Sequence, residues 1–80
     1  MYTVYILKSA KESRRCYIGI TEDLDRRLKE HNDDPSGYSK RYAPWQLETY
    51  ITFKNKLLAE KFETYLKAGS GQAFFKRHLI

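Results

Sequence analysis

The sequence predicts an α/β domain of the α+β type, in which helices flank a small three-stranded antiparallel sheet in the order β-β-α-β-α-α. Three observations predict it. Two short runs rich in β-branched and aromatic residues lie on either side of a polar loop. A third run alternates apolar and polar residues, and apolar residues recur at helical spacing in the segments that follow the second and third runs. A chain of 80 residues has room for one such domain, spanning residues 1–80.

The first two predicted strands form a hairpin near the N-terminus. Residues 2–7 and 16–20 carry the β-branched and aromatic side chains that favour extended backbone. The polar and charged residues 8–15 between them predict a loop. We therefore expect the two strands to pair in an antiparallel manner across this loop.

A helix is expected after the hairpin. Thr21 suits its N-cap position, and Leu24 and Leu28 form an apolar i, i+4 pair in a helix that continues to about Asn32. The segment 33–37 contains Pro and Gly and predicts the end of this helix.

The second half of the chain begins with a connector and the third strand. Residues 38–44 are basic and aromatic, and we expect them to form about one helical turn. Residues 46–53 alternate between polar and apolar side chains, which predicts a strand with one buried face. The side chains expected on that face are Leu47, Thr49, Ile51 and Phe53.

Two further helices are expected after the third strand. Asn55 suits the N-cap of the first, Gly69 suits its C-terminal end, and Ser70 suits the N-cap of the second. Their expected buried residues are Leu58, Phe62 and Tyr65 or Leu66 in the first helix, and Phe74, Phe75 and Leu79 in the second.

The composition favours a polyanionic partner in a reducing compartment. Fifteen Lys and Arg residues outnumber ten Asp and Glu residues, which gives a net charge of +5, and residues 64–80 contain no acid. The single Cys16 cannot form an intrachain disulfide, so we expect a cytoplasmic protein. No run of about 18 apolar residues predicts a membrane span, and no basic segment that would mark a signal peptide precedes the first strand.

Arg27 and His31 are the first candidates for a functional site. At about 100° per helical residue, both lie at the edge of the buried face set by Leu24, while Arg26 points to solvent. A half-buried guanidinium requires an anion, which is either a carboxylate in a structural salt bridge or a phosphate. His31 has the alternative of being an ordinary core histidine.

The hairpin adds two phenols and a glycine. Tyr5 and Tyr17 have the same strand parity, and a loop centred near Lys11 would place them opposite each other on one face. Gly19 follows on that face, where a glycine often marks the close approach of another group to the backbone. Packing of the two rings is the alternative interpretation of the tyrosine pair.

Glu63 borders the packed face of its predicted helix, whereas Glu60 points outward. A carboxylate there would form an ion pair with Arg27 or bind a hard cation such as Mg²⁺, which often takes one or two protein carboxylates. Zinc is excluded by the scattered positions of one Cys and two His residues. The sequence also contains no glycine-rich P-loop and no dinucleotide-binding fingerprint.

The connector 38–45 interleaves cations with aromatic rings, a pattern suited to nucleic acid because cations bind phosphates and rings stack on bases. Its alternative is a structural turn in which Trp45 and one tyrosine cover the core. The predicted nucleic-acid-binding residues are Gly19, Lys40, Arg41 and Tyr42, together with Lys67, Lys76 and Arg77 of the acid-free C-terminal segment, which would extend the same surface.

Four motifs, taken in order, resemble those of the GIY-YIG nuclease family. Residues 3–5 stand where the family has Gly-Ile-Tyr, with Thr and Val replacing the first two residues, and residues 17–19 are Tyr-Ile-Gly. Residues 19–32 resemble the following helix with its Arg and His, and residues 59–67 resemble the helix that carries the metal-binding glutamate. The chain is most similar to small stand-alone members of the branch that includes the N-terminal nuclease domain found in excinuclease ABC.

This resemblance implies a metal-dependent endonuclease that hydrolyses DNA phosphodiester bonds in repair or recombination. Tyr17 or Tyr5 would activate a water molecule, with Tyr17 as the better candidate for the general base. Arg27 would bind the scissile phosphate and His31 would assist proton movement. Glu63 would hold one divalent metal ion, Mg²⁺ or Mn²⁺.

Two alternatives to this hydrolase remain at the level of sequence. The first is a nucleic-acid-binding module without turnover, and the second is an interaction or structural protein in which Arg27 and Glu63 form an ion pair. A chain of 80 residues has little surface for reading bases, so we expect DNA to be recognised by its structure or backbone, or with the help of a protein partner.

Overall fold

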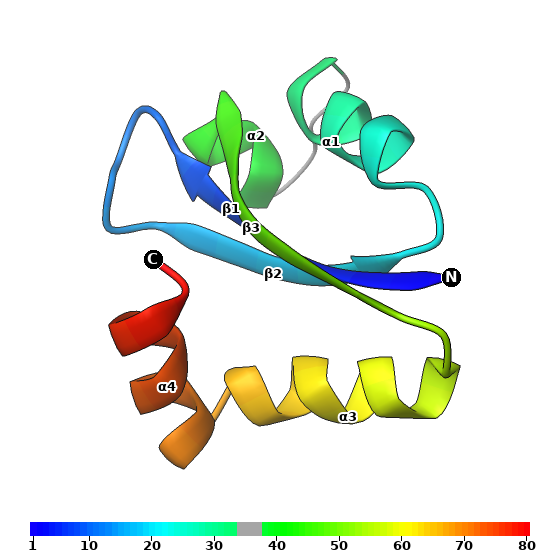
Figure 1. Ribbon diagram of the computed structural model, residues 1–80. Helices are drawn as coiled ribbons and strands as arrows, with labels where there is room; N and C mark the ends of the chain where they lie inside the picture. The colour runs from blue at the N-terminus through cyan, green and yellow to red at the C-terminus, as the bar shows by residue number, and fades with distance from the viewer. Residues whose placement is uncertain (34–37) are drawn as a thin grey trace.

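The computed structural model describes residues 1–33 and 38–80 and contains one antiparallel sheet. Its strands are β1 (Tyr2–Ser9), β2 (Cys16–Thr21) and β3 (Trp45–Phe53), and β1 lies in the middle, between β2 and β3 (Figure 1). The predicted fold class is confirmed. The strands are one to two residues longer than the β-branched and aromatic runs that predicted them.

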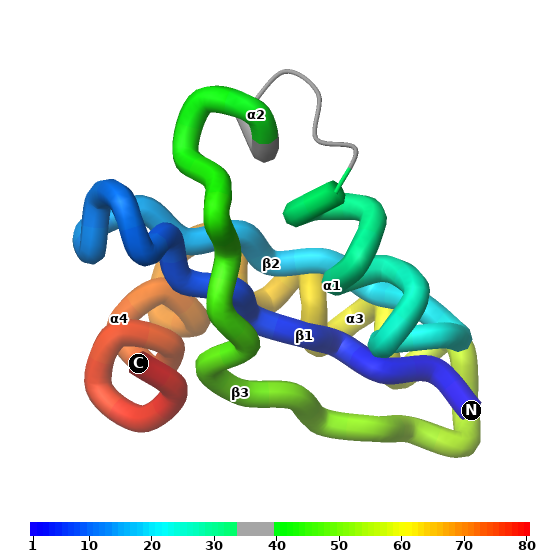
Figure 2. Tube along the Cα trace, turned by 90° about the horizontal axis from the view of Figure 1, so that it is seen from above, coloured from blue at the N-terminus to red at the C-terminus, as the bar shows by residue number. Residues whose placement is uncertain are grey.

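Helices cover both faces of the sheet. On one face lie α1 (Leu24–Asp33) and the short α2 (Tyr38–Tyr42), and on the other lie α3 (Lys56–Leu66) and α4 (Ser70–His78) (Figure 1). Figure 2, which looks down on the sheet, shows α3 running behind β1 and β2. The helical turn expected in the connector is α2, the one addition to the predicted order. None of the helices in the described part of the chain has the length and apolarity that crossing a membrane requires.

The central strand β1 is buried on both faces, because its alternate side chains contribute to two separate clusters. Val4 and Ile6 pack against α3 and α4, whereas Tyr5 and Leu7 pack on the α1 side. The buried members of the first cluster are Val4, Ile6, Ala59, Leu66 and Phe75, and those of the second are Tyr5, Leu7 and Trp45. On β3, the predicted alternation of inward and outward side chains is confirmed.

The N-terminus of α1 differs from the prediction. The Asp23 carboxylate accepts a hydrogen bond from the backbone N–H of Arg26 at 3.1 Å, so Asp23 caps the helix. The Thr21 hydroxyl accepts from the backbone N–H of Asp23 at 3.1 Å and shapes the preceding turn. The prediction of Thr21 as the N-cap was therefore wrong. Asp33 is the last residue of α1, and the rest of the predicted breaker, residues 34–37, lies outside the described residues.

The buried face of α3 is rotated from the predicted one. Asn55 caps the helix as expected, because its side chain accepts a hydrogen bond from the backbone N–H of Leu58 at 3.1 Å. The Leu58 side chain, however, is 55% exposed, while Ala59 and Leu66 are fully buried. The small Ala59 side chain lets the helix approach the sheet closely, which the apolar pattern alone could not show.

The predicted cap of α4 was also wrong. Ser70 is the first residue of the helix, and Gly69 precedes it with a φ of 59°, a backbone conformation that favours glycine. Among the described residues, no side chain caps this N-terminus. Phe75 is buried against the sheet, and its neighbour Phe74 is 37% exposed.

The hairpin register places Tyr5 opposite Gly19 and Tyr17 opposite Leu7. The predicted pairing of Tyr5 with Tyr17 was therefore wrong by two residues, although both side chains remain on the same face. A Cβ atom at residue 19 would lie 2.4 Å from the Tyr5 hydroxyl oxygen. Gly19 is buried, so its close neighbour is the Tyr5 ring and not a nucleic acid.

We expect Gly19→Ala to lower the free energy of unfolding by about 1–3 kcal/mol, because the added methyl group overlaps the Tyr5 ring. Urea denaturation would measure the change. In a Tyr5→Leu background the same substitution should cost less, since the hydroxyl oxygen and the two ring carbons that lie 2.4, 2.6 and 2.9 Å from the new Cβ are then absent. Equal costs in the two backgrounds would contradict the proposed overlap.

Candidate active site

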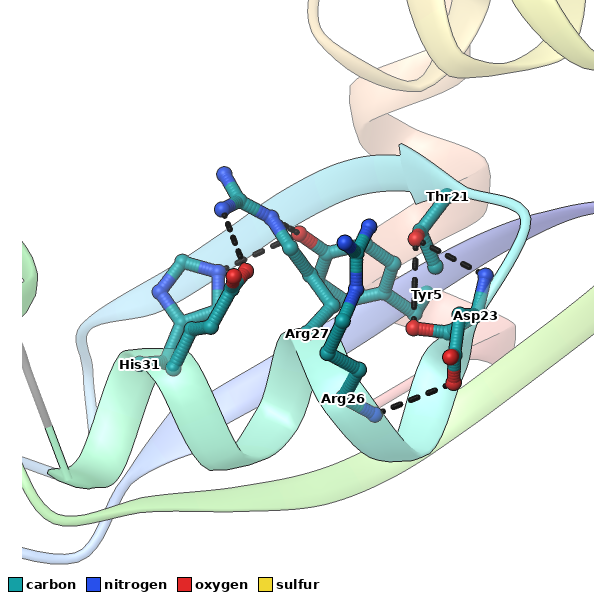
Figure 3. A network of polar contacts seen from close by, with 7 residues as sticks. Tyr5, Thr21, Asp23, Arg26, Arg27 and His31 are labelled. Carbon is teal, nitrogen blue, oxygen red and sulfur yellow. Dashed lines mark hydrogen bonds and ion pairs between the residues drawn. The ribbon is translucent and has the colours of Figure 1, made fainter.

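The hydroxyl of Tyr5 lies at the centre of a polar cluster between β1 and α1. The Arg27 Nε–H donates a hydrogen bond to this hydroxyl at 3.2 Å, and His31 Nε2 lies 3.2 Å from the same oxygen (Figure 3). Arg27 and His31 are four residues apart, so both reach the sheet from one side of α1. Arg26 is exposed, as the helical angles predicted.

Tyr17 completes the cluster through its ring. It is stacked with Tyr5 at a centroid distance of 6.2 Å, and it forms an edge-to-face contact with the His31 ring at a centroid distance of 4.5 Å. The two phenols, Arg27 and His31 therefore share one neighbourhood, as the sequence predicted. Tyr5 is 1% exposed, whereas Tyr17 is only partly buried. Of the two phenols, Tyr17 is the one that solvent reaches.

The charges in this cluster are set by burial and by Arg27. The hydrogen bond to Tyr5 raises the pKa of Arg27, so the guanidinium remains protonated. Burial raises the pKa of Tyr5 despite the opposing effect of Arg27. Burial, reinforced by the positive charge of Arg27, lowers the pKa of His31.

These shifts assign the proton in the cluster. His31 is neutral at pH 7 because its pKa lies below the ordinary value. The Tyr5 oxygen accepts from Arg27, so its own hydrogen is left to donate to His31 Nε2. With Nε2 as the acceptor, this arrangement corresponds to the imidazole tautomer that carries its proton on Nδ1.

Glu63 approaches this cluster from the opposite layer. Its side chain is 20% exposed and forms an ion pair with Lys67 at 3.3 Å. The Tyr5 ring crosses Gly19 of the edge strand β2, and α3 packs against the same strand, so both border this edge of the sheet from its two faces. The negative charge of Glu63 accordingly adds a small contribution to the raised pKa of Tyr5, whose main cause is burial.

The ion pairs differ from the predicted alternative of an Arg27–Glu63 bridge. Among the described residues, Arg27 pairs with Glu30 at 3.2 Å and Glu63 pairs with Lys67. The i, i+3 spacing of Arg27 and Glu30 was visible in the sequence but was not used. Asn32 was also missed: its amide bonds the backbone N–H and C=O of Trp45 and joins the end of α1 to the start of β3.

The chemistry of the donors fits a hard cation at Glu63. Within the part of the chain that the structure describes, no group of three or more His, Cys, Asp or Glu side chains gathers as a metal cluster. A single carboxylate is nevertheless sufficient for Mg²⁺, which keeps most of its water ligands. Glu63 is partly exposed and its charge acts on Tyr5, so it suits this mode of binding.

The predicted basic residues divide between the two layers. Lys40 and Arg41 are exposed on α2, on the α1 side of the sheet (Figure 1). The cations of the C-terminal segment lie on or beside α3 and α4, on the opposite side; they are Lys67, Lys76 and Arg77. The prediction that these cations extend the connector's surface was wrong, because the sheet separates them. Trp45 is 2% exposed, which confirms the alternative in which it covers the core.

Comparison with known proteins agrees with the geometry. The model of the GIY-YIG catalytic domain matches residues 1–77. The chain belongs to the GIY-YIG family. Its central elements carry the family signature at Tyr5, Tyr17 and Gly19, with Thr3 and Val4 in place of the first Gly and Ile.

Relatives of this GIY-YIG chain include subunits of structure-specific endonucleases. It is 36% identical over 85 aligned positions, covering 98% of this chain, to the structure-specific endonuclease subunit SLX1 of Candida dubliniensis. It is 40% identical over 67 positions, covering 78% of this chain, to the corresponding protein of Schizosaccharomyces japonicus. The chain spans 28% and 24% of the length of these two relatives.

A solved structure of similar size shares the fold. The solution structure of a UPF0213 protein from Bacillus halodurans superposes with a TM-score of 0.58 at 26% identity. The match covers 99% of this chain and 87% of that protein. The arrangement seen here therefore also occurs in a chain of nearly the same length.

We expect acidification to destabilise the protein through His31. Its pKa is lowered in the folded state, so below about pH 6.5 the unfolded chain binds a proton that the folded chain does not. The contribution of His31 to stability is constant above that pH and is lost as the pH falls from about 6.5 towards the folded pKa. Melting temperatures measured between pH 7.5 and 5 would record this slope.

His31→Gln should flatten the slope, because glutamine does not titrate. The matched variant His78→Gln, at an exposed position on α4, should retain it. Parallel profiles for the wild type and His31→Gln would show that His31 does not carry the effect.

Proposed function

We propose that this chain is a metal-dependent endonuclease domain that hydrolyses DNA phosphodiester bonds. The observation that carries the proposal is the convergence of Arg27, His31 and two phenols on one face of the sheet, where the charge of Glu63 on α3 also acts on Tyr5. Membership of the GIY-YIG family and similarity to structure-specific endonuclease subunits support it.

Arg27 is suited to bind the scissile phosphate. Its Nε–H is used by Tyr5 and one terminal nitrogen is used by Glu30, which together fix the plane of the guanidinium. The side chain is 39% exposed, so the rest of this fork remains accessible to an anion. Its raised pKa keeps the guanidinium protonated, so its positive charge would stabilise the negative charge that develops on the phosphate oxygens.

The two phenols have different roles in this proposal. Tyr17 is partly exposed and would contact the attacking water as the general base, as expected from the sequence. Tyr5 is buried and would act as a positioning residue that orients Arg27 and His31. His31, neutral and in contact with both rings, would take up or return a proton during the reaction.

Glu63 would hold one divalent ion, Mg²⁺ or Mn²⁺, at the edge of the cluster. When bound, this ion would polarise the phosphate and stabilise the leaving oxygen. The ion pair with Lys67 is partly exposed, so Lys67 is able to move away from the carboxylate at little cost.

Substrate contacts would come from the α1 and α2 side of the sheet. Lys40, Arg41 and Tyr42 lie on that side and suit a phosphate backbone. The small surface favours recognition of DNA structure over base sequence, with a protein partner supplying targeting. The names of the relatives, which describe structure-specific endonuclease subunits, support both points, and they suggest a role in DNA repair or recombination.

We expect Arg27→Ala to lower the rate of cleavage of branched DNA in Mg²⁺ by about 100-fold or more, because the phosphate loses its main cation. The matched variant Arg26→Ala, one residue away and exposed, should cleave as the wild type does. Nicking by Arg27→Ala at the wild-type rate would overturn the assignment. Binding of DNA without cleavage by the wild type would support a binding module instead.

Glu63→Gln should abolish the metal-dependent rate while leaving stability nearly unchanged. The ion pair that it removes is an exposed i, i+4 pair with Lys67, worth about 0.3–0.5 kcal/mol. Cleavage assays with and without Mg²⁺ would be combined with thermal melts of the metal-free protein. A large fall in melting temperature together with unchanged cleavage would assign Glu63 a structural role.

A further inference from the structure

A second cationic cluster lies outside the proposed active site, around the ring of Tyr42. The guanidinium of Arg15, from the β1–β2 loop, lies 5.1 Å from the centre of this ring. The guanidinium of Arg41, from α2, lies 5.4 Å from the same centre. Two like charges from segments 26 residues apart in the chain are thus gathered on one aromatic side chain.

Backbone and side-chain hydrogen bonds hold these two segments together. The Ser9 hydroxyl donates to the carbonyl of Tyr42 at 2.5 Å and accepts from the backbone N–H of Glu12 at 2.9 Å. The backbone N–H of Ala10 donates to the carbonyl of Pro44 at 2.9 Å. Ser9 is 2% exposed, so this connection is buried and keeps the cations in place.

The charge around Tyr42 is not neutralised by the described residues. Lys11, Arg14 and Lys40 are exposed residues of the same two segments, which therefore carry five cations. Among the described residues of these two segments, Glu12 is the only acid that forms an ion pair with one of these cations. It lies 3.8 Å from Arg14, and the Arg14 side chain is 92% exposed. Repulsion among fixed like charges is relieved when an anion binds between them.

The location of the cluster indicates which anion this would be. Tyr42 packs against the buried group of Tyr5, Leu7 and Trp45, the same group against which Tyr17 packs. The cations therefore adjoin the proposed active site on the same face of the sheet. An extended polyanion that reaches Arg27 would pass this cluster, and guanidinium groups match phosphate geometry.

We propose that Arg14, Arg15, Lys40 and Arg41 form a phosphate-binding subsite that holds the DNA backbone beside the scissile phosphate. Tyr42 is its positioning residue, since its ring orders the two central guanidinium groups. This inference rests on the proposed nuclease function and adds to it the hairpin loop as a substrate-binding element. Arg14 and Arg15 were not singled out by the sequence.

The test is the salt dependence of DNA binding in metal-free buffer, where no cleavage occurs. For Arg15→Gln/Arg41→Gln we expect about a tenfold loss of affinity for a branched DNA at low salt. The slope of log K against log salt should fall by about 2, since two phosphate contacts are lost. Lys54→Gln/Lys56→Gln is the matched control, because it removes two exposed charges at the opposite end of β1.

Equal losses in the two double variants would overturn the subsite, because a general electrostatic field would then explain both. If Arg15→Gln/Arg41→Gln lowers the melting temperature, Arg14→Gln/Lys40→Gln replaces it. That variant removes exposed cations of the same two segments that do not order the Tyr42 ring, and it must show the same fall in slope. If the double variant loses the binding of polyglutamate that the wild type shows but binds DNA as the wild type does, the cluster would be assigned to an acidic protein partner. That result would overturn the proposal.

Cleavage kinetics distinguish this inference from the proposed function. If both hold, Arg15→Gln/Arg41→Gln should raise KM several-fold and leave kcat unchanged, since no group at the reacting phosphate is altered. If the wild type binds DNA but never cuts it, the nuclease proposal fails, and the binding slopes still decide the subsite. If Arg15→Gln/Arg41→Gln cleaves DNA with the KM of the wild type and shows the same slope of log K against log salt, the subsite is refuted. The nuclease proposal is not affected by that result.

Discussion

The buried hydroxyl of Tyr5 is the interaction on which the rest of the structure depends. A phenol on the central strand of a sheet must satisfy its polar atom, because an unpaired buried hydroxyl costs about 1–3 kcal/mol. Here the hydroxyl is met by Arg27 and His31, which ties α1 to β1. The same ring needs space across β2, and that space exists because residue 19 is glycine. Strand pairing, helix placement and the electrostatics of the cluster thus share one origin.

The sheet also separates the molecule into two layers with separate hydrophobic clusters. Helices α1 and α2 pack on one face, and α3 and α4 pack on the other. Side chains from opposite layers cannot meet through the central strand, which is filled by packed residues on both faces. At the edge strand β2, Gly19 has no side chain and the Tyr5 ring lies across it. The Glu63 carboxylate on α3 and the Arg27 guanidinium on α1 form ion pairs within their own helices, and both act on the pKa of Tyr5.

The candidate site was largely predictable because its members obey local periodicity. The 3.6-residue period of α1 put Arg27 and His31 on the buried edge and Arg26 in solvent, and the strand period put both tyrosines on one face. The errors arose where local signals compete. Thr21 and Asp23 are both good N-caps, and in the structure Asp23 caps the helix while Thr21 accepts from the N–H of Asp23. Leu58 and Ala59 differ by one helical step, and close packing against the sheet favours the smaller side chain.

The sequence by itself determined the element order, the alternation of β3 and the polar face of α1, since these follow from periods that neighbouring residues impose on one another. Only the tertiary structure decided the hairpin register, the partners of Arg27 and Glu63, and the approach of Arg15 to Tyr42. Those features join residues that are far apart in the chain or that have several local partners. They are settled by the summed packing of the whole sheet, in which a shift of two residues keeps every side chain on its face yet moves Tyr5 from Tyr17 to Gly19.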